Sequence, residues 1–383
     1  MIAVIADDLT GAAEIGGIGL QYGLNVEISR QVKHNTTADL LIINTDSRSK
    51  CLQEAVRAVT EACQDIKRLN PKFIFKKIDS VMRGHVLAEI EAELQVLGWD
   101  SALVASANPH LGRMLIDDVY LVNGVPVHQT SFAIDPEFPV LCADAAGMLK
   151  DETGVVTVCK PDCNFPVSGI TVGEVSGADD LDLWAQHCGR EILPAGSGGF
   201  FSALLKSKLK KATYSSAENG LFHEPVLYVS GTTFAQNARL VSNLKDGAGP
   251  VAYMPASLQQ NKENIKVLAD WCSEVVALLN NQGKAVMAIE QRDNSGFKPD
   301  AAVLRQTIAA AVKRVMEAVE VKELIIEGGS TAAAILNDLN IDTLYPVHEF
   351  GPGLIRCSTM IAANLHVTLK PGSYPWSEKT WIF

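Results

Sequence analysis

The chain has 383 residues, of which 47% are hydrophobic and 20% are charged, and its formal net charge at pH 7 is −11. Because one domain usually has ~150 residues, this length predicts two domains. The acidic balance argues against a nucleic-acid partner, which would require a clustered basic face. No apolar run reaches the ~18 residues of a membrane span, and the sequence starts without the basic segment of a signal peptide. We therefore expect a soluble, cytoplasmic protein without a membrane or nucleic-acid partner.

The eight cysteines are scattered along the sequence. Cys159 and Cys163 are close together, but no second pair or histidine cluster accompanies them to complete a zinc site. We therefore expect free, buried thiols, as in a reducing compartment, and no dedicated metal site.

The first half of the chain alternates short apolar strands with helices. The strands are expected at residues 2–6, 39–45, 73–78 and 102–107, and the helices at 11–22, 51–69 and 86–97. This order predicts a parallel sheet of the α/β class. On the helix at 86–97 we expect Glu89, Glu91 and Glu93 to lie mostly on the solvent side.

Further along, residues 121–127 predict a hairpin with an Asn123-Gly124 turn. Strands follow at 155–159 and 169–175, and residues 190–205 pass from a strand through a Gly/Ser loop into a helix. The polar, lysine-rich stretch 206–225 has no apolar period, which is typical of a linker. We predict two α/β domains, each with a largely parallel sheet flanked by helices. Their boundaries are expected at 1–205 and 226–383, with the linker at 206–225.

Polar residues follow four strands of the first half. The clusters are Asp7 to Gly11, Asn44 to Ser49, Asp79 to His85 and Ser106 to Arg113. In a parallel sheet these strand ends share one edge, where ligands usually bind. Carboxylates, hydroxyls and arginines there suit a small, anionic, polyhydroxylated ligand. A local alternative stays open, because Asp8 or Thr10, and Asp79 or Ser80, could simply cap the helices that follow.

The strand ends of the second half are rich in Gly, Ser and Thr. They comprise residues 230–233, 327–331, 351–353 and 370–373. Backbone N–H groups at such turns can cradle phosphate, which favours a nucleotide pocket. A Walker loop is missing. Residues 16–23 resemble a dinucleotide fingerprint only superficially, because Tyr22 occupies the place of the third glycine.

Seven motifs match one known family in order and at sensible spacing. They are ADDLTGA (6–12), DSVMRG (79–84), ANPHLGR (107–113), VSGTT (229–233), EGGST (327–331), GPG (351–353) and LKPGSYP (369–375). With these motifs the chain resembles the four-carbon acid sugar kinase family. The resemblance implies an N-terminal sugar-acid-binding domain and a C-terminal nucleotide-binding domain. It also implies ATP-dependent phosphorylation of threonate, erythronate or 3-oxotetronate.

The resemblance also implies roles for individual residues. The sugar acid would face Asp7, Asp8, Arg48, Asp79 and Arg83, with Thr10, Ser80, Gly84 and Arg113 beside them. ATP would face Ser230, Gly328, Gly329, Ser330, Thr331, Gly353 and Gly372. His85 stands where the family often has Asn, and the ending from Lys370 to Pro375 departs from the family pattern, which leaves the substrate open.

As a mechanism, we expect Arg83 to hold the substrate carboxylate, helped by Arg48 or Arg113. Asp8 or Asp79 would take the proton of a terminal hydroxyl, and we favour Asp8. ATP would bring Mg²⁺, whose ligands would be mainly phosphate oxygens and water. Two alternatives are a non-catalytic protein that binds a sugar acid or nucleotide, and an NAD-linked sugar-acid dehydrogenase. Whether the chain forms a homodimer stays open.

Overall fold

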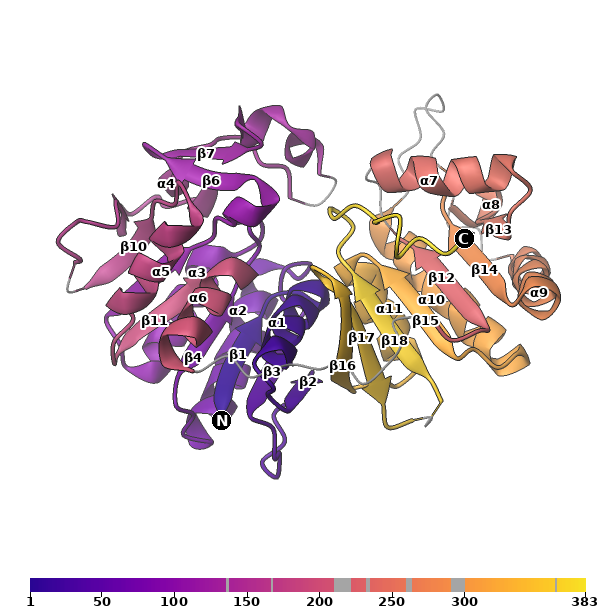
Figure 1. Cartoon of the computed structure of the whole chain (residues 1–383), viewed down its shortest axis with the longest axis horizontal. Helices are drawn as coiled ribbons and strands as arrows, with labels where there is room; N and C mark the ends of the chain where they lie inside the picture. The colour runs from indigo at the N-terminus through magenta and orange to yellow at the C-terminus, as the bar shows by residue number, and fades with distance from the viewer. Residues whose placement is uncertain are drawn as a thin grey trace. The chain divides into compact units, whose positions relative to one another are not determined.

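The structure is a computed structural model that describes residues 1–135, 138–166, 168–209, 222–231, 235–259, 264–290, 300–361 and 364–383. The chain divides into two compact units, Met1–Ser215 and Ser216–Phe383 (Figure 1). Most of the segment predicted as a linker lies outside the described residues. Both units are of the α/β class, as predicted.

The first unit is built on a parallel sheet with the strand order β2-β3-β1-β4-β11-β5-β10-β9. Its strands are β1 (Ile2–Ala6), β2 (Val26–Ser29), β3 (Leu40–Asn44), β4 (Ile74–Lys77), β5 (Ser101–Ala105), β9 (Val156–Cys159), β10 (Gly169–Gly173) and β11 (Ile192–Gly196). β1 and β3 are buried along their whole length. Because the strands are parallel, all their carboxyl ends lie on the same edge of the sheet.

Helices cover both faces of this sheet (Figure 1). They are α1 (Leu9–Gln21), α2 (Leu52–Arg68), α3 (Val86–Leu97), α4 (Ala145–Leu149), α5 (Ala178–His187) and α6 (Gly198–Lys208). Adjacent residues of β4 show which helices face which side. Lys76 pairs with Glu89 of α3, whereas Lys77 lies 3.4 Å from Glu14 of α1. Since neighbouring side chains of a strand point to opposite faces, α3 and α1 lie on opposite sides of the sheet.

A small antiparallel sheet follows β5. It consists of β6 (Arg113–Ile116), β7 (Val119–Val122) and β8 (Val125–Pro126). Asn123 and Gly124 both have positive φ, 51° and 78°, as the predicted hairpin turn requires. Short 3₁₀ helices at Val127–Gln129 and Ser131–Ile134 come next. The sequence pattern predicted the hairpin but neither β6 nor these 3₁₀ helices.

The prediction that the acids of α3 face solvent is wrong for Glu89 and Glu93. Glu89 is 1% exposed and Glu93 is fully buried, and only Glu91 lies on the solvent side. The buried Lys76 accounts for the difference, because its Nζ lies 2.5 Å from Glu89 Oε2 and 3.4 Å from Glu93 Oε1. Burial raises the pKa of Glu93 to about 7; Lys76 opposes this shift and Glu89 adds to it.

The second unit has the strand order β13-β14-β12-β15-β18-β17-β16, parallel from β13 to β18 and antiparallel thereafter. Its strands are β12 (Val226–Ser230), β13 (Val251–Tyr253), β14 (Lys284–Ala288), β15 (Glu323–Glu327), β16 (Thr343–Gly351), β17 (Leu354–Thr359) and β18 (His366–Lys370). Its helices are α7 (Ala235–Asp246), α8 (Ala256–Gln259), α9 (Ile265–Gln282), α10 (Ala301–Ala318) and α11 (Gly329–Asp338).

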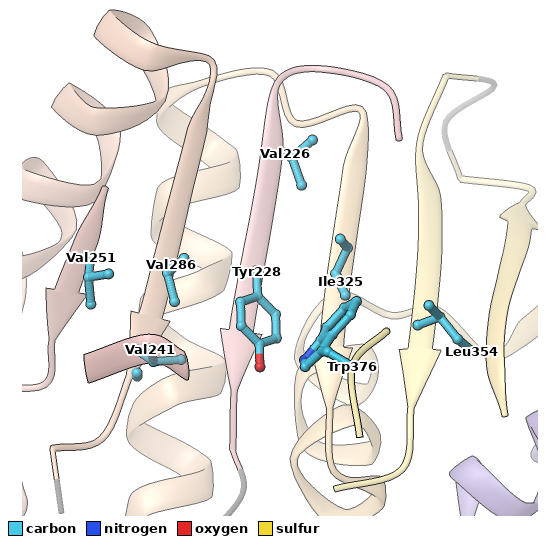
Figure 2. Close-up of a cluster of buried hydrophobic side chains, with 9 residues drawn as sticks. Val226, Tyr228, Val241, Val251, Val286, Ile325, Leu354 and Trp376 are labelled. Atoms are coloured by element: carbon cyan, nitrogen blue, oxygen red, sulfur yellow. The ribbon is translucent and has the colours of Figure 1, made fainter. Parts of the chain in front are cut away.

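One face of the second sheet carries an apolar cluster that the C-terminal segment helps to close. Tyr228 lies at its centre, between Val286 of β14 and Ile325 of β15 (Figure 2). Trp376 packs edge-on against the Tyr228 ring, with 5.5 Å between the ring centroids. This packing holds the segment after β18 close to the ends of β12 and β15.

All eight cysteines are free thiols, as expected from the sequence. The expectation that they are buried is wrong for Cys51, which is exposed, and for Cys142, Cys159 and Cys163, which are half-buried. Across the described ranges, every helix is too short or too polar to cross a membrane.

Candidate functional site

Three parallel strands of the first unit bring the predicted acid-binding residues to one edge of the sheet. Asp7 and Asp8 follow β1, Arg48 follows β3, and Asp79 and Arg83 follow β4. We call these five residues the acid–arginine cluster. All of them are at least mostly buried, so their charges depend on one another rather than on water.

Arg48 holds this cluster together. Its Nε and Nη2 each donate a 2.8 Å hydrogen bond to Asp7, and Nη2 also lies 3.0 Å from Asp8 Oδ1. Its Nη1 is 3.6 Å from Asp79 Oδ1. One guanidinium therefore faces three carboxylates, which explains how two adjacent acids can share a strand end.

Gly84 permits the close approach of the loop after β4 to Arg48. It has φ +98°, and a Cβ atom at this position would lie 3.1 Å from Arg48 Cγ. A larger residue would therefore strain the backbone and press on the arginine.

Asp79 is fully engaged by hydrogen-bond donors. Its carboxylate accepts from Arg83 Nε and Nη2 at 3.0 and 2.8 Å, and from the backbone N–H groups of Val81 and Arg83. Burial alone would raise its pKa, but Arg83 and Arg48 hold the pKa of this carboxyl far below its usual range. Asp79 is therefore a permanent anion with little capacity to take a proton.

Asp8 has two roles in the structure. It is the N-cap of α1, since its Oδ1 accepts a 2.9 Å bond from the Gly11 N–H, and Thr10 Oγ1 donates to its Oδ2 at 2.5 Å. The capping alternative therefore holds for this residue together with its place beside Arg48. Burial acts to raise its pKa, but Arg48 and the buried Lys77 outweigh this, so the pKa lies below the ordinary value. Sequence reasoning missed Lys77.

Asp7 differs from its neighbour. Burial raises the pKa of Asp7, and the charge of Asp8 adds to this shift, although Arg48 opposes it. The pKa values of the two adjacent carboxyls are thus shifted in opposite directions, upward for Asp7 and downward for Asp8. Of the pair, Asp8 is the stronger acid.

The remaining residues predicted for the acid site lie beside the cluster. Arg113, on β6, donates from Nη1 to Ser80 Oγ, and the Tyr120 hydroxyl donates to the Ser80 carbonyl. The guanidiniums of Arg83 and Arg113 both lie over the ring of Phe132, at 5.2 and 5.5 Å from its centroid. Sequence reasoning missed Phe132 because it lies in an irregular segment without a periodic pattern.

Asp135 is a second residue of that segment. Its Oδ2 accepts a 2.7 Å hydrogen bond from Arg83 Nη1, and its Oδ1 accepts one of 2.7 Å from the Phe138 N–H. Asp135 directly follows the 3₁₀ helix Ser131–Ile134, and no pattern in the sequence pointed to it as a residue of the site.

In the second unit, the predicted nucleotide-binding turns converge in the same way. A Cβ atom on Gly231 would lie 2.1 Å from Thr331 Oγ1, so the turn after β12 directly contacts the first turn of α11. Gly328, the N-cap of α11, donates its N–H to the Lys370 carbonyl at the end of β18. The Gly353 turn packs on the ring of Tyr374. Thr232 and Thr233 lie outside the described residues.

A buried polar cluster joins these turns from beneath. Glu327, at the end of β15, is fully buried and lies 2.6 Å from Lys370 Nζ. Tyr228 and Asn237 also donate to its carboxylate, and Asn237 donates to the Gly372 carbonyl at 2.9 Å. Burial raises the pKa of Glu327, which the Lys370 charge opposes. Tyr228, Asn237, Glu327 and Lys370 therefore form a scaffold cluster for the turns.

The predicted residues thus gather in two separate sets, one in each unit. Ser230 lies beside Glu327, with 3.4 Å from its Oγ to Oε2, whereas Gly329 and Ser330 begin α11. Within the described ranges, no three His, Cys, Asp or Glu side chains are grouped as metal ligands.

Two family models match the chain, one in each unit. The model described as Sugar-binding N-terminal domain matches residues 2–204, and the model described as Nucleotide-binding C-terminal domain matches residues 229–374.

Several kinases are similar in sequence. The chain is 27% identical to a D-threonate kinase of Salmonella typhimurium, over 97% of this chain and 94% of that protein. It is 37% identical to a D-erythronate kinase of Heliobacterium modesticaldum over 40% of this chain and 38% of that protein. It is 21% identical to a 3-oxo-tetronate kinase of Pseudomonas savastanoi pv. phaseolicola, over 98% of this chain and 94% of that protein.

Two solved structures are similar along their whole length. A protein from Salmonella typhimurium LT2 superposes with a TM-score of 0.75 at 15% identity, covering 100% of this chain and 99% of that one. A Haemophilus influenzae protein gives a TM-score of 0.67 at 19% identity, covering 99% and 98%. At these identities the likeness shows the shared fold alone.

Proposed function

The chain belongs to the four-carbon acid sugar kinase family, and from this premise we propose that it transfers the γ-phosphoryl group of ATP to a terminal hydroxyl of a four-carbon sugar acid. Threonate, erythronate and 3-oxotetronate are the candidate acids, because similar proteins are named as kinases of these compounds. The first unit would bind the acid and the second the nucleotide.

The acid–arginine cluster carries this proposal. It combines hydrogen-bond acceptors for hydroxyl groups with guanidiniums for a carboxylate, at the edge of a parallel sheet where ligands bind. Arg48 is already held by three aspartates, so we assign it the positioning of these carboxylates rather than contact with the substrate carboxylate. Arg83 and Arg113 remain the candidates for that contact.

We propose Asp8 as the general base. A carboxylate offers about four acceptor positions. Four hydrogen bonds occupy those of Asp79, in addition to the nearby Arg48. Asp8 accepts hydrogen bonds from Thr10 and from the Gly11 N–H and forms an ion pair with Arg48. Its lowered pKa keeps the Asp8 carboxylate ionised, and we propose that its remaining acceptor capacity serves a substrate hydroxyl.

The second unit supports nucleotide binding through backbone rather than side-chain charge. The turns after β12 and β15 pack directly on each other, and α11 begins at the Gly328 turn. N–H groups at a helix N-terminus favour phosphate oxygens. The hydroxyl oxygens of Ser330 and Thr331 lie in the same turn and could serve as metal ligands, which suits a site where Mg²⁺ arrives with the phosphates. When bound, Mg²⁺ would neutralise charge on the phosphates.

ADP release with Mg-ATP and a panel of four-carbon acids tests this proposal. The panel would contain D- and L-threonate, D- and L-erythronate and 3-oxotetronate, with nicotinamide-cofactor reduction measured in parallel. ADP release that depends on one acid supports the kinase. Binding of an acid or ATP without any turnover would favour a non-catalytic binding protein, and acid-dependent NAD reduction would favour a dehydrogenase; either result would overturn the proposal.

A further inference from the structure

The guanidinium of Arg83 is shared between two carboxylates. Its Nε and Nη2 face Asp79, and its Nη1 donates to Asp135 Oδ2 at 2.7 Å. The nitrogen that Asp79 leaves for another anion is therefore held by Asp135. A substrate carboxylate that binds Arg83 through Nη1 would therefore compete with this second aspartate.

The charges around the acid site leave little room for a further anion. Five carboxylates (Asp7, Asp8, Glu14, Asp79 and Asp135) stand against three guanidiniums (Arg48, Arg83 and Arg113) and the ammonium of Lys77, so the formal sum, four minus five, is −1. A bound sugar acid would bring this sum to −2 if every aspartate kept its place. In a mostly buried site such an excess is costly, so one carboxylate has to withdraw.

Asp135 is the most exposed of the four aspartates. Asp8 and Asp79 are bonded to backbone N–H groups of their own strand-end turns, and Asp7 is bonded to Arg48 through two nitrogens. Asp135 also accepts a backbone N–H bond, from Phe138, but it follows a 3₁₀ helix outside the parallel sheet. Its side chain is 17% exposed, against 4% for Asp7, 11% for Asp8 and 8% for Asp79. It therefore regains water most readily when it leaves the arginine.

We infer that Asp135 is a specificity-determining residue of the acid site: it occupies the Arg83 Nη1 position until a ligand carboxylate replaces it. This inference rests on the proposed function, because it assumes that the first unit binds a sugar acid. A carboxylate restores the charge-assisted hydrogen bond that Asp135 gives up. A neutral polyol has no group that can do so, and the site therefore discriminates against it.

The exchange has a measurable consequence. Acid affinity in the wild type is reduced by the fraction of molecules in which Asp135 covers Arg83. In Asp135→Asn the competing charge is removed, and the dissociation constant for the acid should fall by about tenfold. The affinity for a neutral four-carbon polyol, which does not displace Asp135, should stay the same within about twofold.

Calorimetric titration of each purified protein with D-threonate, D-erythronate, 3-oxotetronate and erythritol tests the inference. Asp135→Glu should restore wild-type affinity, since it keeps the charge. Asp117→Asn is the matched control: it removes one negative charge from an exposed ion pair with Lys160 and should leave every affinity unchanged. Thermal unfolding of each variant checks that it folds.

The outcomes separate this inference from the proposed function. If the wild type binds and phosphorylates an acid that Asp135→Asn binds equally or less tightly, the inference is overturned and the kinase proposal stands. Equal gains for the acid and erythritol would also overturn it, because the effect would not depend on the carboxylate. If neither protein binds or phosphorylates any acid, both proposals fail.

Discussion

The strand ends of the two units carry charge in different ways. In the first unit, the side chains of Arg48 and Arg83 are 15% and 14% exposed, so the charged groups themselves reach the surface of the site. In the second unit, Lys370 and Glu327 are 2% and 0% exposed and lie beneath glycine turns. Under the proposed function, the first unit would present side-chain charge to its ligand. The second unit would present backbone N–H groups and would use side-chain charge only to fix them in place.

The largest expected effect comes from breaking the scaffold cluster of the second unit. Lys370→Met would leave the Glu327 carboxylate buried without its cation, and should lower the free energy of unfolding by about 3–5 kcal/mol. Urea denaturation measures this loss. The double variant Lys370→Met/Glu327→Gln is the control, because it removes both charges and should recover part of the stability. A single variant as stable as the wild type would show that the pair has no structural role.

Next in size is the loss of the proposed base in the first unit. Asp8→Asn should lower kcat by about 10²-fold or more while KM for ATP stays nearly constant, because the base acts only on the substrate hydroxyl. Asn is also a good N-cap, so α1 should remain intact. Asp7→Asn neutralises the adjacent carboxyl and is the matched control, with a smaller loss of kcat. If Asp8→Asn keeps full turnover, another group is the base.

A smaller effect is expected where the backbone only supports a charged side chain. Gly84→Ala should cost about 1–2 kcal/mol of stability through its positive φ, and should also raise KM for the acid by displacing Arg48. Gly98→Ala is the matched control, because Gly98 has φ +74° but no atom within 4 Å of the added Cβ. It should lose similar stability with an unchanged KM. Equal KM values for both variants would contradict the role given to Arg48.

The last effect is a dependence of stability on pH, and it concerns a buried charge that faces away from the acid site. The folded-state pKa of Glu93 is about 7, above its ordinary value of 4.5, so the folded protein binds more protons between these two pH values. Its contribution to stability is therefore present below about pH 4.5 and is lost as pH rises to about 7, by at most ~1.4 kcal/mol per pH unit. Glu93→Gln should flatten the dependence of unfolding free energy on pH over this range. An unchanged slope would mean that Glu93 is not the titrating group.

The regular parts of the fold could be predicted from the sequence. Apolar runs such as residues 2–6 and 39–45 correspond to β1 and β3, and the polar residues after them do meet at one sheet edge. Which arginine forms an ion pair with which aspartate could not be predicted from the sequence pattern. Arg48 lies 41 residues from Asp7, and Asp135 lies 52 residues from Arg83, so only the folded chain brings them together.

The burial of Glu89 and Glu93 shows the same limit. Helical periodicity treats acidic residues as solvent-facing, but Lys76 on a neighbouring strand supplies a cation inside the unit. For the glycine turns of the second unit, the sequence pointed to the turns but not to the side chains that support them. Composition alone drew attention to them, yet Asn237 and Tyr228, which hold them in place, lie on a helix and a strand without a distinctive motif.

The division of roles between the units is tested most directly by measuring the affinity for each ligand separately in two variants. Arg83→Gln removes a side-chain charge from the first unit, and Gly231→Ala adds a Cβ that would clash with Thr331 in the second. Calorimetry should show that Arg83→Gln loses acid binding by about tenfold or more but binds ATP normally, and that Gly231→Ala does the reverse. This division of roles would be contradicted if either folded variant lost affinity for both ligands. It would also be contradicted if Arg83→Gln lost affinity for ATP alone or Gly231→Ala for the acid alone, because the first unit would then not be the acid-binding unit and the second not the ATP-binding unit.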